Sequence, residues 1–170
     1  MLELQNIKKV YTGGKVAVDN VSLTLEPGQI VGLFGENGAG KTTLMKCILN
    51  LLKYQGEITL DGQPIFENPR VKVRIGNIPD DIFYFPSATL DEMRNFYESI
   101  YPQFDGQLYE RLFDAFQLPR KSPLRRFSKG MQKQAAFHLS LCTKPDVLIL
   151  DEPVDGLDPV MRRQVWSIIM

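Results

Sequence analysis

The sequence contains few of the residues and patterns that mark disulfide scaffolds, metal clusters or membrane spans. Only two cysteines and one histidine occur among its 170 residues, which argues against a disulfide framework and a Cys/His metal site. Lysine plus arginine and aspartate plus glutamate each number 20, so the formal net charge is zero and no nucleic acid partner is expected. No apolar run approaches the roughly 20 residues of a transmembrane helix. We therefore expect a soluble, cytoplasmic chain.

The chain is long enough for one hydrophobic core. Of its 170 residues, 44% are hydrophobic, and the length is too short for two ordinary domains. Cys47 and Cys142 lie in apolar segments with helical spacing, which favours buried thiols. We predict a single domain that spans residues 1–170.

Short β-prone runs fill residues 1–34, with turns at 12–15 and 27–28. The last of these runs, residues 30–34, is continuously apolar and predicts a buried strand. A glycine-rich stretch follows, and the apolar spacing over residues 41–52 predicts a helix. This order of strand, loop and helix is typical of one half of a βαβ unit.

The remaining sequence alternates between strand-like and helix-like segments. Residues 56–65 predict a hairpin around the Asp61-Gly62 turn, and residues 71–78 predict another strand. Residues 146–150 predict a short strand of the kind buried in parallel sheets. Helices are expected at about 87–101, 106–116, 128–142 and 159–170.

A glycine-rich loop joins the strand predicted at 30–34 to the helix predicted at 41–52. It matches the pattern G-x-x-x-x-G-K-[ST] with Gly35, Glu36, Asn37, Gly38, Ala39, Gly40, Lys41 and Thr42. Glycines let successive backbone N–H groups converge on one anion, because no Cβ atom stands in the way. With a strand before it and a helix after it, the loop is predicted to bind phosphate.

Three side chains at the start of the predicted helix complete this site. Lys41 supplies a positive charge for the β- and γ-phosphates of a nucleotide during binding and catalysis, and the Thr42 hydroxyl can ligate Mg²⁺. Thr43 is placed to donate to the α-phosphate. The helix N-terminus adds its own partial positive charge.

Two carboxylates follow the apolar strand predicted at 146–150. Asp151 and Glu152 would emerge at the carboxyl end of that strand, where ligands bind in open α/β sheets. We predict that Asp151 holds Mg²⁺ through a water molecule and that Glu152 orients and deprotonates the attacking water. Together with the phosphate loop, this pair predicts hydrolysis of a nucleoside triphosphate.

Two further motifs flank the carboxylates: FSKGMQ at residues 127–132 and DGLDP at residues 155–159. With these four elements in order, the chain resembles the ATP-binding cassette (ABC) ATPases, the nucleotide-binding subunits of prokaryotic ABC transporters. The resemblance implies an α/β fold with a P-loop NTPase sheet and an N-terminal antiparallel β-subdomain. It also implies an inserted helical subdomain at about residues 87–124.

The resemblance assigns roles outside the phosphate loop. Tyr11 would stack on the adenine of ATP, and Asp158 would lie in the loop that couples two subunits. Ser128 and Gly130 would bind the γ-phosphate of the ATP held by a second ATPase subunit, in a head-to-tail dimer that ATP closes. A helix that starts at Ser128 suits this role, because its N–H groups offer a second anion-binding end.

The resemblance also implies partners and a location. Hydrolysis of Mg-ATP would drive transport by the membrane subunits of an ABC transporter, so the chain would be peripheral on the inner face of the cell membrane. Residues 83–85 (FYF) are candidates for a groove that receives a helix of a membrane subunit. Packing in the core explains the same aromatic residues equally well.

Two departures from the family pattern touch the predicted site. Lys129 and Met131 replace a glycine and a glutamine of the signature string, a change that we expect to leave binding intact. Asp80 stands where the family usually has a glutamine, and its carboxylate can still reach Mg²⁺ or its water.

A third departure concerns the end of the sequence. The family continues with a strand that ends in a switch histidine, whereas this sequence stops at Met170. The single histidine, His138, lies in a predicted helix and is interpreted as a structural residue. We expect a sheet that is incomplete toward the C-terminus, and little or no ATP turnover from these 170 residues.

Two other functions stay open. One is a non-transport ABC ATPase acting in translation or DNA repair, although the interval between Lys41 and Lys129 leaves no room for the long coiled coil of repair ATPases. The other is a module that binds nucleotide to regulate a partner without turnover. A GTPase is disfavoured, because no N-K-x-D string occurs.

Overall fold

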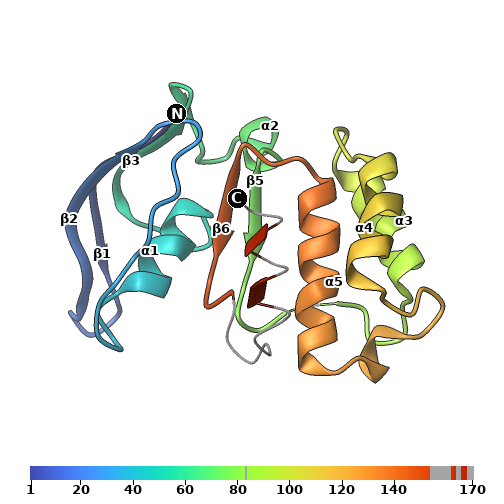
Figure 1. Ribbon diagram of the computed structural model, residues 1–170. Helices are drawn as coiled ribbons and strands as arrows, with labels where there is room; N and C mark the ends of the chain where they lie inside the picture. Colours follow the sequence, from blue (N-terminus) through green and yellow to red (C-terminus); the bar gives the residue numbers. More distant parts are fainter. Residues whose placement is uncertain (83, 154–161, 164–165, 168–170) are drawn as a thin grey trace. The chain divides into compact units, whose positions relative to one another are not determined.

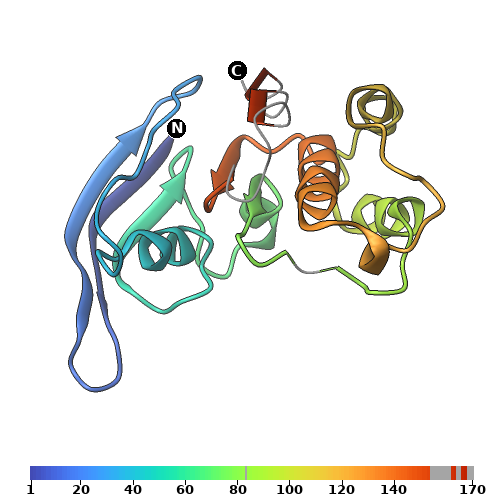
Figure 2. The same cartoon turned by 60° about the horizontal axis from the view of Figure 1, so that its bottom comes forward.

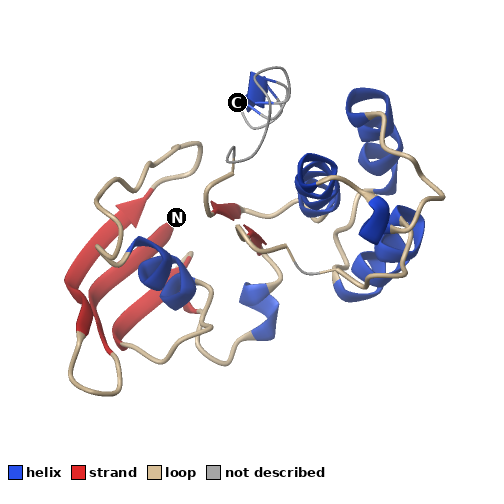
Figure 3. Ribbon diagram, turned by 90° about the horizontal axis from the view of Figure 1, so that it is seen from below, coloured by secondary structure: helices blue, strands red, loops and turns tan. Residues whose placement is uncertain are grey.

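The computed structural model describes residues 1–82, 84–153, 162–163 and 166–167. The chain forms two compact units, the N-terminal unit Met1–Ile75 and the C-terminal unit Gly76–Met170. Strands dominate the first unit and helices the second, as the colouring in Figure 3 shows. In the described parts of the chain, no helix is long and apolar enough to cross a membrane.

An antiparallel sheet forms most of the N-terminal unit (Figure 2). Its strands, in the spatial order β2-β1-β3-β4, are β1 (Leu2–Val10), β2 (Val16–Leu25), β3 (Gln55–Leu60) and β4 (Gln63–Pro64). Leu2, Leu4 and Ile7 of β1 are buried, and Leu2 faces both Leu25 of β2 and Leu60 of β3. The predicted N-terminal antiparallel β-subdomain is therefore confirmed.

The hairpin between β3 and β4 turns where the sequence predicts it. Asp61 and Gly62 both have positive φ angles, 50° and 73°, as the tightest hairpin turns require. The Asp61 carboxylate also pairs with Arg74 and with the N-terminal ammonium, and these contacts lower the pKa of Asp61. The turn is thus tied to two distant parts of the same unit.

Helix α1 (Lys41–Ile48) lies against this sheet (Figure 2) and buries Leu44, Cys47 and Ile48. It is shorter than the predicted helix 41–52, because Asn50 adopts a positive φ of 54° and ends it. Cys47 is a free, buried thiol, as predicted.

The apolar run at residues 30–34 corrects one prediction. The sequence predicts a buried strand here, but the run forms no strand, and Phe34 is 95% exposed. None of the strands in the described residues pairs with it. A strand becomes buried only when neighbours satisfy its backbone groups and cover its faces, so an apolar pattern alone does not bury it.

The strand predicted at 71–78 is half correct. Its first part belongs to the short helix α2 (Pro69–Lys72), and only β5 (Ile75–Ile78) is extended. Pro69 occupies the first helical turn, a position that suits its fixed φ and missing N–H. This local signal outweighs the β-branched residues that follow it.

The C-terminal unit packs three helices against one another (Figure 1). They are α3 (Leu90–Ile100), α4 (Gly106–Phe116) and α5 (Lys129–Cys142), and a short 3₁₀ turn, η1 (Leu124–Arg126), precedes α5. Each helix begins at a side chain that caps it: Thr89, Asp105 and Ser128 accept hydrogen bonds from N–H groups of the first turn. The helices therefore start close to their predicted positions.

His138 lies at the centre of this unit, fully buried on α5. Its Nε2–H donates to the Tyr109 carbonyl oxygen at 2.6 Å, and its ring lies against the rings of Tyr109, Phe113 and Phe116. Burial lowers the pKa of His138 to about 4, although the hydrogen bond to Tyr109 acts in the opposite direction. The structural role predicted for this histidine agrees with these contacts.

Strand β6 (Val147–Leu150) pairs with β5 in a two-stranded sheet. The N–H of Asp151, directly after β6, donates to the carbonyl of Ile78, the last residue of β5, at 3.0 Å. The carboxyl ends of the two strands therefore lie together, as in a parallel pair. The helix predicted at 159–170 falls largely outside the described residues, of which 162–163 and 166–167 are helical.

Candidate functional site

The loop from Gly35 to Thr42 is closed by its own lysine. Lys41 Nζ donates to the carbonyl oxygens of Gly35 at 2.7 Å and Glu36 at 3.0 Å. The ammonium group is therefore held over the start of the loop rather than extended into solvent. Its positive charge lies where the loop begins, beside the backbone groups that the sequence assigns to phosphate.

Two glycines set the shape of this loop. Gly38 and Gly40 have φ angles of 86° and 96°, which are strained for any residue with a Cβ atom. A Cβ on Gly40 would also collide with the carbonyl oxygen of Ala17 in β2, whereas a Cβ on Gly38 would meet open space. Gly40 thus anchors the loop to the sheet, and Gly38 leaves its outer surface free for a ligand.

The start of α1 is open to an anion. No described side chain caps this helix, and its first turn carries no acidic residue. The first N–H groups of a helix have no partner within the helix and carry a partial positive charge. With Lys41 beside them, these groups fit the phosphates of a nucleotide.

Tyr11 contacts the same helix start. Its hydroxyl lies 3.2 Å from the Thr43 hydroxyl, and Lys9 Nζ lies 5.3 Å from the centre of its ring. The structure therefore brings the residue predicted to stack on adenine next to the residue predicted to contact the α-phosphate. Tyr11 is exposed, so one face of its ring is accessible to a ligand.

The acidic pair follows β6 in the C-terminal unit. Glu152 has a positive φ of 47°, so the backbone turns sharply directly after Asp151, and the Glu152 side chain is exposed. The described residues contain no group of three His, Cys, Asp or Glu side chains that could hold a metal ion by themselves. Magnesium ordinarily takes one or two protein oxygens together with phosphate and water, and the Asp151 carboxylate offers an oxygen donor of that kind.

Lys133 of α5 is a residue that the sequence analysis missed. Its side chain is only 7% exposed, and its Nζ donates to the backbone carbonyl of Glu152 at 2.7 Å. The same Nζ lies 3.3 Å from an oxygen of Asp80, whose side chain is 54% exposed. One ammonium group thus joins the predicted metal ligand Asp80 to the backbone of the predicted base.

The signature string lies at the start of α5. Ser128 caps the helix by accepting the Met131 N–H at 3.2 Å, and Gly130 follows in the first turn. A serine oxygen that accepts this bond keeps its own O–H available as a donor. Asp158, the residue predicted to couple two subunits, lies outside the described residues.

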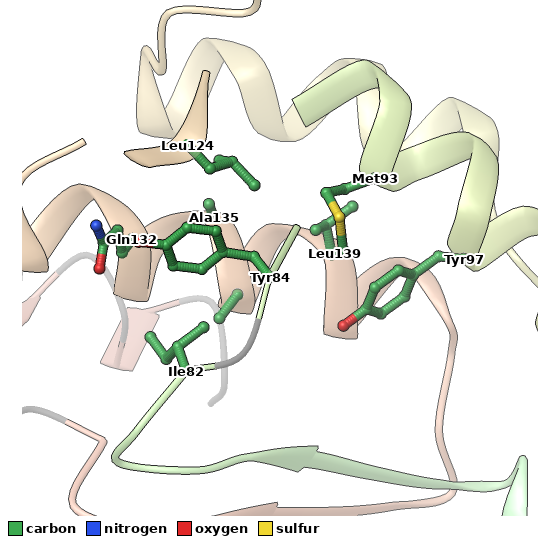
Figure 4. Close-up of a pocket in the computed structure, with 9 residues that line it drawn as sticks. Ile82, Tyr84, Met93, Tyr97, Leu124, Gln132, Ala135 and Leu139 are labelled. Atoms are coloured by element: carbon green, nitrogen blue, oxygen red, sulfur yellow. The ribbon is translucent and has the colours of Figure 1, made fainter. Parts of the chain in front are cut away.

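A shallow hollow, open to solvent, lies between α5, α3 and the segment that follows β5 (Figure 4). Tyr84 and Tyr97 line it together with Met93, Leu124 and Leu139, and Gln132 stands at its edge. Of the three aromatic residues predicted to form a groove, Tyr84 lines this hollow and Phe85 is exposed, packing edge-on against Phe96. Phe83 lies outside the described residues.

Comparisons with known proteins agree with these features. The sequence profile of a family described as ABC transporter matches residues 18–155. The ABC transporter ATP-binding protein YtrB of Bacillus subtilis is 35% identical over the whole chain, and the Nod factor export ATP-binding protein I of Cupriavidus metallidurans is 34% identical over 98% of it. The chain spans 58% and 57% of the lengths of these two relatives.

A solved structure shares the fold. It is described as "Structure of ATP binding subunit of ABC transporter", and it superimposes on 99% of this chain and 73% of its own with a TM-score of 0.91 at 27% identity. The likeness confirms the predicted fold class, a P-loop NTPase fold with an N-terminal antiparallel sheet and a helical portion.

Proposed function

Because the chain belongs to the ABC transporter family, we propose that it binds Mg-ATP and, in the full-length protein, hydrolyses it to drive transport. The observation that carries this proposal is the start of α1. An uncapped helix, two glycines with positive φ and a lysine meet there around one exposed loop. This combination fits the phosphates of a nucleotide.

The N-terminal unit is proposed to bind the nucleotide. Lys41 would leave the carbonyls of Gly35 and Glu36 and turn to the β- and γ-phosphates, and the loop N–H groups would hold the same oxygens. Tyr11 and Thr43 would exchange their mutual contact for the adenine and the α-phosphate. The hydrogen bonds between protein groups would thus be replaced by stronger, charge-assisted ones.

The C-terminal unit is proposed to supply the hydrolytic groups. Glu152 would orient the attacking water and accept its proton, while Asp151, Asp80 and Thr42 would hold Mg²⁺ directly or through water. The ion, when bound, neutralises charge that develops on the phosphate oxygens. Because the chain spans 58% of the length of YtrB, we propose that these 170 residues alone turn over little ATP.

A second ATPase subunit is proposed to complete the site. The Ser128 hydroxyl and the N–H groups near Gly130 would donate to the γ-phosphate of ATP bound by that subunit, in a head-to-tail dimer, with Asp158 near the contact. Loss of the γ-phosphate would then remove the interactions that favour the closed dimer.

Membrane subunits are the proposed partners of the hollow lined by Tyr84 and Tyr97, and they would hold the chain at the inner face of the cell membrane. The names of relatives support a transport role: one acts in Nod factor export, and the linearmycin resistance ATP-binding protein LnrL of Bacillus subtilis is 34% identical. Transport is therefore favoured over a role in translation or repair.

The test of binding compares ATP, ADP, AMP and adenosine by fluorescence titration of the 170-residue chain. The affinity for the nucleotide should fall with each phosphate removed, because the loop binds phosphate rather than the base. Equal affinity for ATP and adenosine would refute the proposed site.

The test of hydrolysis uses the full-length protein. Phosphate release should be lost in Glu152→Gln with ATP affinity retained, whereas Glu98→Gln, at an exposed position of α3, should behave as the wild type. Turnover that survives in Glu152→Gln would refute the role of Glu152 as the base.

A further inference from the structure

We propose that Lys133 positions Glu152 for catalysis, by joining the Glu152 backbone carbonyl to the carboxylate of Asp80. The inference rests on the proposed hydrolysis of ATP and adds a residue to it. Lys133 itself touches neither nucleotide nor water in this scheme. It acts through the backbone of the base.

The location of Lys133 is unusual for its charge. It lies in the first half of α5, four residues before the fully buried Phe137, and its own side chain is 7% exposed. A lysine removed from water is costly unless its ammonium group is paired and hydrogen-bonded. Asp80 at 3.3 Å and the Glu152 carbonyl at 2.7 Å supply both requirements.

The contact falls at a backbone position that needs support. Glu152 adopts a φ of 47°, which disfavours a residue with a side chain. Its own side chain is exposed, so packing does not fix where the carboxylate points. The hydrogen bond from Lys133 ties this turn to α5, and the direction of the Glu152 side chain follows from the turn.

Asp80 makes the arrangement specific to this sequence. It follows β5 directly after Pro79, and the carboxyl ends of β5 and β6 lie together through the Asp151 to Ile78 hydrogen bond. The shared ammonium therefore links the residues after both strands. A glutamine at position 80 would offer no negative charge to balance Lys133.

The experiment measures ATP turnover and ATP affinity of the full-length protein with Lys133→Met. Methionine has a similar length and fills the same space without charge or donor. We expect kcat to fall about 10-fold or more, because a small misplacement of a catalytic group is costly, while KM and ATP affinity stay within about twofold. Lys133→Arg, which keeps the charge and the donors, should recover most of the lost kcat.

A matched control separates positioning from general stability. Lys144 lies just after α5 in the same unit and also pairs with an aspartate, Asp105, at 3.4 Å, but its side chain is 59% exposed. Lys144→Met should leave kcat unchanged. If Lys133→Met does not fold, Lys133→Gln serves in its place, since it keeps a polar group and loses the charge.

The outcomes distinguish the inference from the proposed function. Wild-type kcat in a folded Lys133→Met variant, or a fall in kcat that Lys133→Arg does not reverse, would overturn the inference and leave Glu152 as the base. Turnover that survives in Glu152→Gln would remove both. A selective fall in kcat for Lys133→Met, reversed by arginine, supports the positioning role.

Discussion

Helices α1 and α5 begin in opposite ways. The start of α5 is satisfied by its own chain, because Ser128 accepts the Met131 N–H. The start of α1 has glycine at the capping position and no side-chain cap within the described residues. Each follows a motif that the family resemblance assigns to phosphate, yet only one leaves its backbone donors without a side-chain acceptor.

The difference separates two kinds of anion site. A helix end that caps itself gains stability of about 1 kcal/mol and loses one donor. An uncapped end forgoes that stability and keeps its N–H groups for a ligand. We infer that α1 is built to hold phosphate alone, whereas α5 can only contribute to a phosphate already held elsewhere.

The sharpest test of this contrast is Lys41→Ala. Loss of a charged donor to phosphate should weaken ATP binding about 10²-fold, as measured by titration with a fluorescent ATP analogue. Lys46→Ala, on the exposed face of the same helix, is the matched control and should bind normally. Unchanged affinity in Lys41→Ala would mean that the start of α1 is not the phosphate site.

Acid should distinguish the two helices next, because only α5 contains a histidine. The pKa of His138 is about 4 in the folded chain and 6.5 in its usual range, so the unfolded state binds the extra proton first. Above about pH 6.5 the histidine is neutral in both states and does not lower the free energy of unfolding. As the pH falls from 6.5 toward 4, protonation of the unfolded state lowers this free energy by as much as about 3 kcal/mol.

Urea unfolding between pH 7 and pH 4.5 measures this loss. In His138→Gln the dependence on pH over this range should be much weaker. Carboxylates whose lowered pKa values do not depend on His138, such as Glu92 with its hydrogen bonds from Thr89, lose their contribution at lower pH and act equally in both proteins. Parallel curves for the two proteins would argue against the histidine as the cause.

Gly40→Ala tests how α1 is anchored. A Cβ there would collide with the Ala17 carbonyl and impose a disfavoured φ, so we expect a loss of about 2 kcal/mol or more. Gly38→Ala has a similar φ but open space and should cost about 1 kcal/mol. Denaturant melts of both variants give the difference, and equal losses would show that the approach to β2 is unimportant.

The smallest effect is expected for Ser128→Ala. Removal of the cap should destabilise the C-terminal unit by about 1 kcal/mol, seen as a lower urea midpoint. Thr42→Val at the start of α1 removes a hydroxyl that caps nothing and should leave the midpoint almost unchanged. A larger loss for Thr42→Val than for Ser128→Ala would reverse the contrast between the two helix starts.

Local signals made most of the fold predictable. The hairpin at Asp61-Gly62, the helix at 106–116 and the start of α5 at Ser128 each depend on residues within a few positions of one another. The prediction of a buried strand at 30–34 was wrong, because strand burial depends on a partner far away in the chain. The strand predicted at 71–78 was wrong in its first half, because Pro69 starts a helix just upstream.

The candidate site divides in the same way. The phosphate loop and the acidic pair are contiguous motifs, so the sequence alone was enough to predict them as site residues. Lys133 was missed because its partners Asp80 and Glu152 lie 53 and 19 positions away. A lysine four residues before Phe137, on the buried side of a helix, was the one signal that could have indicated it.

The exposed apolar run at residues 30–34 has a practical consequence. An exposed apolar segment without a neighbouring strand promotes association between molecules. This chain should therefore aggregate as its concentration rises, and its apparent mass should increase. Light scattering across a dilution series will define the highest protein concentration that the titrations can use without self-association.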